Sequence, residues 1–220
     1  MNRLWERFLD LLFPPKCVFC RSLLSDGERD LCPRCRRELP WLFGPAAERK
    51  PEFITLTVSP LRYEGAVRDS FHRYKFYGQT AYAGAYGRLI ADCIRAHLDE
   101  PCDLVTWAPL SRRRKRERGY DQAQLLARTV ARELELPLCP TLEKIRDTTP
   151  QSGLEESSAR RANALGAYRC IAPDTVRGKQ VLLIDDIITS GATASECARM
   201  LRTAGAKAVF CATLASAHRE

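Results

Sequence analysis

Apolar positions along the chain alternate between a two-residue repeat typical of strands and a 3.6-residue repeat typical of helices. Short apolar or alternating runs predict strands at 54–58 (continuing to 62–63), 103–107, 138–145, 181–184 and 208–214. Between these runs, apolar positions at helical spacing predict helices over 65–76, 80–97, 120–134 and 193–203. This order is typical of a parallel sheet that helices cover on both faces. We therefore expect an α/β fold for most of the chain.

The segment before Pro51 follows neither repeat and is rich in cysteine and arginine. It has too few apolar residues to build a core of its own, so we expect two parts, residues 1–50 and residues 51–220. Within the second part, residues 148–166 are polar and weakly patterned, which is typical of either a lid over a site or a disordered connection. The candidate lid residues are Gln151, Leu154, Arg160, Arg161 and Asn163.

The first thirteen residues predict a short amphipathic helix, because Leu4, Phe8, Leu11 and Leu12 fall at helical spacing. Charged residues interrupt this segment, unlike the apolar core of a signal peptide. The sequence contains no run of about 18 apolar residues, so we expect no transmembrane helix. We expect a cytoplasmic protein in a reducing compartment, where disulfides are disfavoured.

The chain is basic, with 35 Lys and Arg against 27 Asp and Glu and a formal net charge of +8. Such a balance favours anionic partners, which include phosphates, nucleic acid and acidic membrane surfaces. The net charge does not choose among these partners. A basic surface that binds none of them is equally consistent with it.

Four of the ten cysteines form two Cys-x-x-Cys pairs, Cys17 with Cys20 and Cys32 with Cys35. Eleven residues separate the pairs, enough for a hairpin through Ser25-Asp26-Gly27. Four thiolates can close a tetrahedron around zinc and leave no open position, so we predict a structural zinc site. Disulfides or free thiols are the alternative interpretation. The remaining cysteines lie mainly in apolar stretches and are expected in the core: Cys93, Cys102, Cys139, Cys170, Cys197 and Cys211.

Residues 181–193, which read Val-Leu-Leu-Ile-Asp-Asp-Ile-Ile-Thr-Ser-Gly-Ala-Thr, carry the most specific pattern in the chain. A buried strand leads to Asp185 and Asp186, and a short hydroxyl-rich loop leads into a helix. Ligands of open α/β sheets bind at the carboxyl ends of the strands. The free N–H groups of a helix N-terminus suit a phosphate, and carboxylates suit ribose hydroxyls or a magnesium ion. The segment therefore predicts a ribose-phosphate site.

These thirteen residues resemble the motif with which type I phosphoribosyltransferases bind 5-phosphoribosyl-1-pyrophosphate (PRPP). The resemblance implies that Asp185 and Asp186 are the catalytic pair and bind the ribose hydroxyls or Mg²⁺. It also implies that the loop binds the 5-phosphate through Thr189, Ser190, Gly191, Ala192 and Thr193. The alternative interpretation is that these polar residues only cap a turn and a helix.

A second strand is followed by residues 109–122, a basic segment with six Lys or Arg that we expect to be a loop. In type I phosphoribosyltransferases a loop at this position binds the pyrophosphate, although it is usually shorter and less basic. The resemblance assigns Pro109, Leu110, Ser111 and Arg112 to the pyrophosphate side. The same charge could bind a nucleic-acid backbone, or it could be a solvated face. Lys75 is a further candidate phosphate ligand, although a lone lysine is more often a surface residue.

The chain as a whole resembles the ComF family. The resemblance rests on the four cysteines, on Tyr-Lys-Phe-Tyr-Gly at 74–78, on Arg-Gly-Tyr-Asp-Gln at 118–122, and on Gln151, Arg160 and Asn163 before the paired aspartates. It implies a bacterial, cytoplasmic protein associated with natural transformation, where incoming single-stranded DNA is handled at the inner membrane. DNA-uptake proteins at that membrane are then candidate partners.

Two hypotheses of function follow. In the first, the chain is a phosphoribosyltransferase in which an acceptor, unidentified from the sequence, displaces pyrophosphate from C1 of PRPP. In the second, it is a single-stranded DNA-binding module that retains a ribose-phosphate pocket without turnover, with Tyr74, Phe76 and Tyr77 available to stack on bases. A zinc-stabilised scaffold without a ligand would explain the cysteines but not the paired aspartates.

Overall fold

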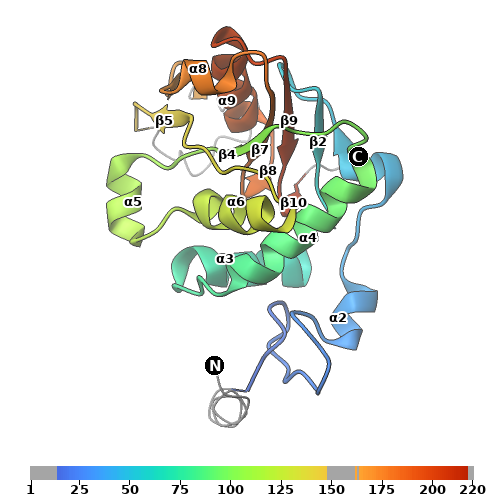
Figure 1. Cartoon of the computed structure of the whole chain (residues 1–220). Helices are drawn as coiled ribbons and strands as arrows, with labels where there is room; N and C mark the ends of the chain where they lie inside the picture. The colour runs from blue at the N-terminus through green and yellow to red at the C-terminus, as the bar shows by residue number, and fades with distance from the viewer. Residues whose placement is uncertain (1–13, 148–161, 163, 218–220) are drawn as a thin grey trace.

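The computed structural model describes residues 14–147, 162 and 164–217, which form a central sheet with helices on both faces and a cysteine-rich segment at one end (Figure 1). The helix predicted at 1–13 lies outside the described residues. The candidate lid residues Gln151, Leu154, Arg160, Arg161 and Asn163 lie outside them as well.

Five strands form the central sheet in the order β1 (Glu48–Arg49), β2 (Leu56–Val58), β9 (Ala208–Ala212), β7 (Gln180–Ile184) and β4 (Leu104–Trp107). All neighbours are parallel except β1, which pairs antiparallel with β2 at one edge. The strands predicted near 54–58, 103–107, 181–184 and 208–214 are confirmed. Because β7 lies between β9 and β4, the residues that follow it emerge between the ends of two neighbouring strands.

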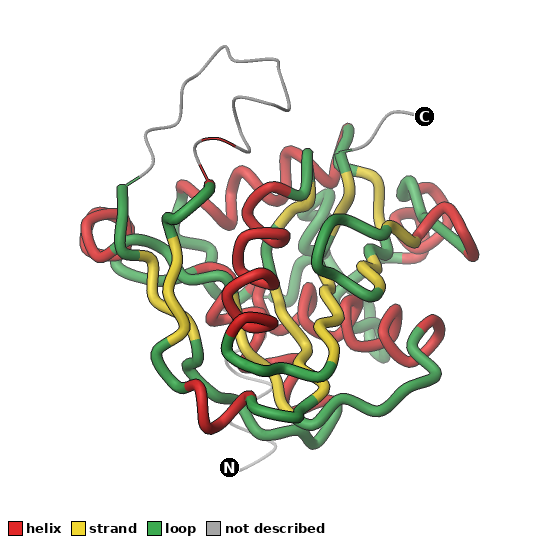
Figure 2. The backbone as a smooth tube through the Cα atoms, turned by 90° about the horizontal axis from the view of Figure 1, so that it is seen from above, coloured by secondary structure: helices red, strands yellow, loops and turns green. Residues whose placement is uncertain are grey.

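The alternation of side chains along β7 divides the core into two layers. Leu182 and Ile184 point to the face covered by α3 (Gly65–Phe76), α4 (Tyr82–His97) and α6 (Gln122–Glu133). Val181 and Leu183 point to the opposite face, which α9 (Ala192–Thr203) covers. Figure 2 shows helices on both sides of the strands. The fold class and these four helices, predicted within two residues of their observed bounds, are confirmed.

Three strands of the central sheet break and restart in a second, smaller sheet. β2 restarts as β3 (Leu61–Arg62), β7 as β8 (Ile187–Ile188) and β9 as β10 (Ala215–Ser216), and β10 pairs in parallel with the other two. At the break, the buried hydroxyls of Ser59 and Thr213 lie 2.7 Å apart and hydrogen-bond to each other. The break in β7 consists of Asp185 and Asp186, so the paired aspartates lie between two sheets.

The basic segment expected as a loop is instead helical over α5 (Arg112–Arg118). The Ser111 side chain caps its N-terminus by accepting the Arg114 N–H, and Gly119 ends it with a φ of 78°. Lys, Arg and Glu are good helix formers, so both capping and propensity favour this short helix. No residue of α5 is buried, so it lacks the apolar repeat from which a helix is normally recognised.

The remaining elements are short. Antiparallel β5 (Leu142–Lys144) and β6 (Tyr168–Cys170) form a two-stranded sheet, of which the sequence predicted only β5 within 138–145. A four-residue helix, α8 (Pro173–Val176), leads back to β7, and α2 (Pro33–Glu38) and the 3-10 helix η1 (Gly44–Ala47) belong to the N-terminal segment. In the described part of the chain, none of the helices has both the length and the apolar character needed to cross a membrane.

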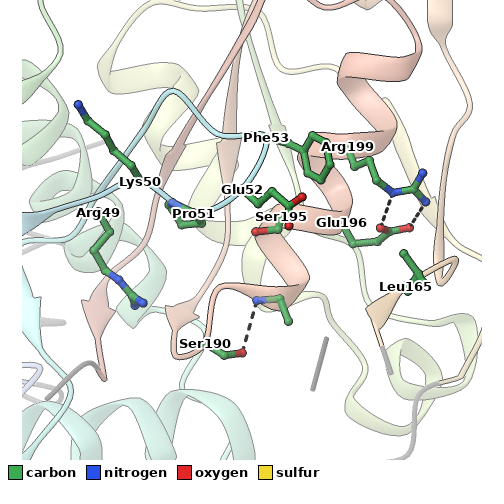
Figure 3. Close-up of a pocket in the computed structure, with 11 residues that line it drawn as sticks. Arg49, Lys50, Pro51, Glu52, Phe53, Leu165, Ser190, Ser195, Glu196 and Arg199 are labelled. Atoms are coloured by element: carbon green, nitrogen blue, oxygen red, sulfur yellow. Dashed lines mark hydrogen bonds and ion pairs between the residues drawn. The ribbon is translucent and has the colours of Figure 1, made fainter. Parts of the chain in front are cut away.

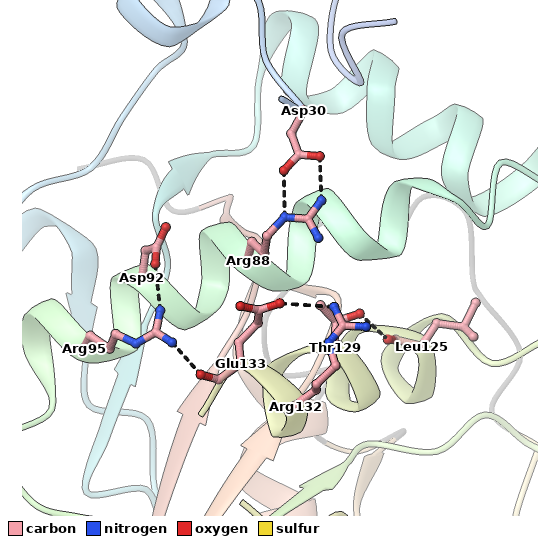
Figure 4. Close-up of polar contacts among 8 residues, drawn as sticks. All are labelled: Asp30, Arg88, Asp92, Arg95, Leu125, Thr129, Arg132 and Glu133. Carbon is pink, nitrogen blue, oxygen red and sulfur yellow. Dashed lines mark hydrogen bonds and ion pairs between the residues drawn. The ribbon is translucent and has the colours of Figure 1, made fainter. Parts of the chain in front are cut away.

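Helices α4 and α6 approach each other closely at Gly87. A Cβ atom at this position would lie only 2.4 Å from the Cβ of Thr129 on α6, so the contact requires glycine. Further along, Arg95 of α4 hydrogen-bonds the Glu133 carbonyl of α6 (Figure 4). Helices α4 and α6 are therefore held together both at their middle and near their C-terminal ends. The N-terminal segment packs on the layer that contains them.

Candidate functional site

The four paired cysteines form one cluster. Their Sγ atoms all lie within 4.8 Å of one another, and those of Cys20 and Cys32 are 3.5 Å apart. A zinc ion bound at about 2.3 Å from each of four sulfurs requires sulfurs about 3.8 Å apart, so the cluster fits this ion. The predicted turn is present, since the Glu28 N–H donates to the Ser25 carbonyl at 3.0 Å. The second pair begins α2, where the Cys35 N–H donates to Cys32 Sγ.

None of the ten cysteines, all of which lie among the described residues, forms a disulfide. Cys93, Cys197 and Cys211 are buried, and Cys102, Cys139 and Cys170 are half-buried. The cluster of four is thus set apart from the other cysteines by geometry, and its four ligands would fill the coordination shell of a structural zinc.

The cysteine cluster is held against the helical layer by polar contacts. Arg88 of α4 donates two hydrogen bonds to Asp30, at 2.7 and 2.5 Å, and both side chains are only about one-fifth exposed (Figure 4). From α3, Arg73 donates to the Phe19 carbonyl at 2.6 Å, and buried Ser70 donates to the Val18 carbonyl. The peptide groups next to the first cysteine pair are therefore satisfied by α3.

The two aspartates that follow β7 each engage one backbone N–H. The Asp186 N–H donates to Asp185 Oδ1 at 2.8 Å, and the Ile187 N–H donates to Asp186 Oδ1 at 2.6 Å. Both carboxylates are half-buried. Within the described part of the chain, the second oxygen of each carboxylate makes no hydrogen bond. Turn capping therefore occurs, but it uses only half of the acceptor capacity.

The two carboxylates lie on different sides of the sheet. Asp185 lies on the side of α9, where burial and the nearby Asp186 carboxylate together raise its pKa well above the usual range. Asp186 lies on the side of α3 and α6, where its charge acts on Tyr63, Tyr74 and Arg118. A ligand at the end of β7 can therefore contact residues from both helical layers.

The hydroxyl-rich loop leads into α9 without a side-chain cap. The N-cap residue is Gly191, with a φ of 78°, and a Cβ atom there would lie 3.3 Å from the Pro51 side chain. The Ser190 hydroxyl accepts the Ala192 N–H at a long 3.4 Å, and Arg49 of β1 holds the Thr189 carbonyl at 2.8 Å. An uncapped N-terminus of a 12-residue helix offers N–H groups and a positive partial charge to an anion.

A pocket of about 510 Å³ opens on the β1 side of this helix N-terminus (Figure 3). Ser190, Ala192 and Ser195 line it from α9 and its preceding loop, and Arg49 and Lys50 line it from the opposite wall. The loop is therefore accessible from this side as well as from the side of the carboxylates.

The segment predicted to bind pyrophosphate lies beside the aspartates. β4 pairs with β7 to the last residue of each, and the Ala108 N–H donates to the Ile184 carbonyl at 2.9 Å. The Leu110 N–H donates at 2.9 Å to Asp121, which fixes the turn that Pro109 and Ser111 flank. Arg112 instead points to Glu143 of β5, with 2.6 Å between Nη2 and Oε1.

Lys75, the other candidate phosphate ligand, lies on α3 with its ammonium group 5.8 and 5.7 Å from the ring centroids of Phe71 and Phe76. In the described structure it makes no hydrogen bond or ion pair with the paired aspartates.

The sequence analysis did not identify two residues near Asp185. Lys144 of β5 and Tyr168 of β6 are cross-strand partners, and the Lys144 ammonium lies 5.1 Å from the Tyr168 ring centroid. Burial lowers the pKa of Lys144 and raises that of Tyr168. No local pattern marks these residues, because the two strands come together across more than 20 intervening residues.

Two family models match separate parts of the chain. Residues 121–220 match the model of the phosphoribosyl transferase domain, and residues 8–49 match that of the double zinc ribbon domain. The chain is 30% identical over 229 residues to the DNA utilization protein YhgH of Salmonella typhi, covering 93% of this chain and all of the relative. It is 25% identical to competence protein F of Haemophilus influenzae, over 88% of this chain and 93% of that one. It is 26% identical to competence protein ComFC of Bacillus subtilis, over 90% and 83% respectively.

Proposed function

The chain belongs to the ComF family, and on this premise we propose that the end of β7 binds PRPP together with Mg²⁺. The observation that carries the proposal is the pair of half-satisfied carboxylates beside an uncapped helix N-terminus. Acceptor oxygens and phosphate-binding N–H groups in one place match a sugar that carries both hydroxyls and phosphates.

Each part of PRPP has a place in this arrangement. Thr189, Ser190, Gly191, Ala192 and Thr193 bind the 5-phosphate, and Asp185 and Asp186 bind the ribose hydroxyls. Pro109, Leu110 and Ser111 hold the pyrophosphate side, next to which Arg112 and Lys144 supply positive charge. Carboxylate oxygens are suitable ligands for Mg²⁺, which when bound would neutralise charge on the pyrophosphate.

The reaction that this site would support is phosphoribosyl transfer. The bond from C1 to the pyrophosphate oxygen breaks, pyrophosphate leaves with the electron pair, and a nucleophilic N–H group of the acceptor bonds to C1 and loses its proton. Positioning and charge neutralisation would supply most of the rate acceleration. Release of pyrophosphate in a screen of acceptors at saturating PRPP tests turnover separately from binding.

Calorimetric titration of PRPP with Mg²⁺ tests the site itself. We expect saturable binding to the zinc-loaded protein and a loss of at least about tenfold in affinity in the Asp185→Asn/Asp186→Asn variant. The control variant Asp69→Asn/Asp92→Asn removes the same charge from two exposed positions on α3 and α4 and should bind normally. Absence of binding to the folded, zinc-loaded wild-type protein would refute the proposal.

The names of the relatives support a role in DNA uptake or utilisation. A cytoplasmic location, with uptake proteins at the inner membrane as partners, is part of the proposal and rests on the family resemblance alone. A specific observation favours a second candidate function, the binding of single-stranded DNA. Helix α5 carries six Lys or Arg and buries none of its residues. We expect affinity for an oligothymidylate to fall steeply with salt, and the slope of log K against log salt to shrink by about 0.7 for each phosphate contact removed. Arg113→Ala/Arg116→Ala should shrink it, whereas Arg128→Ala/Arg132→Ala on α6 should not.

A further inference from the structure

Residues 49–53, here called the strap, run beside the hydroxyl-rich loop that precedes α9. All five line the 510 Å³ pocket on the β1 side of that loop, across from Ser190 (Figure 3). Most of the strap belongs to no strand, because β1 ends at Arg49 and β2 begins at Leu56. The strap is therefore the connection that carries the chain from the edge of the sheet past the loop.

The strap has a defined backbone path. Arg49, its first residue, pairs with Thr57 of β2. A turn follows, in which the Ile54 N–H donates to the Pro51 carbonyl at 3.2 Å. Within this turn Phe53 has a φ of 65°, in the left-handed region that a phenylalanine seldom occupies. Such a conformation persists where the surrounding structure dictates it, so the strap presents Arg49 and Pro51 from a fixed position.

Two contacts join the strap to the loop. Arg49 Nη1 donates to the Thr189 carbonyl at 2.8 Å, although the two residues are 140 positions apart in the sequence. The same nitrogen lies 3.5 Å from the Ser216 hydroxyl, so the Thr189 carbonyl is its closer acceptor. The Pro51 side chain lies beside Gly191, 3.3 Å from the position that a Cβ atom there would take. The strap therefore holds the loop from its outer side.

The hydrogen bond from Arg49 fixes the direction of one N–H group of the loop. The Thr189 carbonyl and the Ser190 N–H belong to the same trans peptide group, in which they point in opposite directions. Because the carbonyl is held toward the strap, the Ser190 N–H points away from it. In the described structure this N–H donates to no protein atom. It is therefore available to a phosphate, and its orientation is set from outside the loop.

We propose that Arg49 is a positioning residue for the 5-phosphate, which acts through the peptide group between Thr189 and Ser190. The inference rests on the proposed function. Arg49 is the last residue of the match to the double zinc ribbon model and lies outside the match to the phosphoribosyl transferase domain model at 121–220. Without its guanidinium the peptide group would rotate and turn the Ser190 N–H away from the phosphate. Ordering the loop would then cost free energy during binding, so affinity would fall.

Calorimetry with Mg²⁺ present tests this role with two ligands. Ribose 5-phosphate needs the loop, whereas pyrophosphate needs only the other end of the site. Arg49→Ala should weaken the binding of ribose 5-phosphate about tenfold, as expected for a lost hydrogen bond from a charged donor, and leave the affinity for pyrophosphate unchanged. Arg49→Lys should restore most of the affinity, because an ammonium group can donate to the same carbonyl.

Two further variants complete the comparison. Arg95→Ala removes a hydrogen bond from an arginine to the Glu133 carbonyl, between α4 and α6, and should leave both affinities unchanged. Arg49→Met keeps the aliphatic part of the side chain but has no donor. It should repeat the loss seen with Arg49→Ala, and it replaces that variant if the alanine protein does not fold.

The outcomes separate this inference from the proposed function. If Arg49→Ala binds ribose 5-phosphate as tightly as the wild type, or weakens both ligands alike, Arg49 does not position the loop and the ribose-phosphate site stands. An Arg49→Lys protein that binds no better than Arg49→Ala would have the same meaning. If the folded, zinc-loaded wild-type protein binds neither PRPP nor ribose 5-phosphate, the proposed function is refuted, and this inference with it.

Discussion

The cysteine cluster and the paired aspartates differ in how much of their bonding capacity is left for a ligand. Four sulfurs converge within 4.8 Å, and Ser70, Arg73 and Arg88 hold the surrounding backbone and Asp30. At the end of β7, each carboxylate engages one neighbouring N–H, and the following helix begins without a side-chain cap. The first region is completed by one ion and its own chain. The second carries binding capacity that folding does not use, which is the physical difference between a structural centre and a ligand site.

The largest expected effect comes from breaking the cysteine cluster. Cys35→Ser should lower the zinc content from one ion per chain toward zero and reduce Tm by more than about 10 °C, because structural zinc contributes on the order of 10 kcal/mol to such segments. Metal analysis and calorimetry measure both quantities. Cys139→Ser, at a half-buried cysteine outside the cluster, should leave the zinc content unchanged. A zinc-free but equally stable Cys35→Ser protein would show that the cluster is not structural.

Substitution of Asp185 is expected to change the stability in the opposite direction. The raised pKa of Asp185 means that the folded protein disfavours its charged form, so this carboxyl lowers stability as pH rises above the ordinary range of aspartate. Asp185→Asn should therefore raise Tm by several degrees at pH 7.5, and the gain should shrink as pH falls toward the unfolded-state pKa, about 3.9. Calorimetry at several pH values tests this. An Asp185→Asn protein less stable than wild type at pH 7.5 would contradict the view that the site is held at a cost to folding.

A smaller loss of stability is expected from removing the ion pair that joins α4 to the cysteine segment. Arg88→Ala removes the largely buried pair with Asp30 and should cost about 1 kcal/mol, a fall in Tm of about 2–4 °C. It should also speed the loss of zinc to a chelator. Arg68→Ala, which removes a longer and largely exposed pair with Asp69 on α3, should change Tm less. Equal effects of the two substitutions would mean that Asp30 does not anchor the cysteine segment.

The sequence was most informative where neighbouring residues build the structure. The strand at 181–184, the break at Asp185 and Asp186, and the helix from Ala192 all follow one another along the chain, so a local pattern specifies them. The cysteine spacing likewise predicted a cluster that forms within about 20 residues. The domain boundary at Pro51 stays a prediction, as do the roles of the individual site residues.

The residues that the sequence did not reveal are those that meet across long separations. Lys144 reaches Tyr168 only through strand pairing, and Phe76 reaches Arg118 only because α3 packs on the turn before α6. Helix α5 was missed for a different reason. With every residue solvent-accessible, it has no apolar side from which a period can be read, and its end signals at Ser111 and Gly119 went unrecognised within a run of charge.

The two-residue strand β1 has a consequence for any attempt to separate the cysteine segment from the rest of the chain. Glu48 and Arg49 pair with Val58 and Thr57, and only Lys50 separates them from Pro51. A chain cut there would lose the strand that covers the outer edge of β2, leaving its N–H and C=O groups open to pair with the same edge of another copy. The covering contacts of Val18 and Phe19 on α3 would be lost at the same time. Such a fragment should associate with itself at concentrations where the intact chain does not. The end of the cysteine segment therefore also protects the edge of the sheet from pairing with another copy.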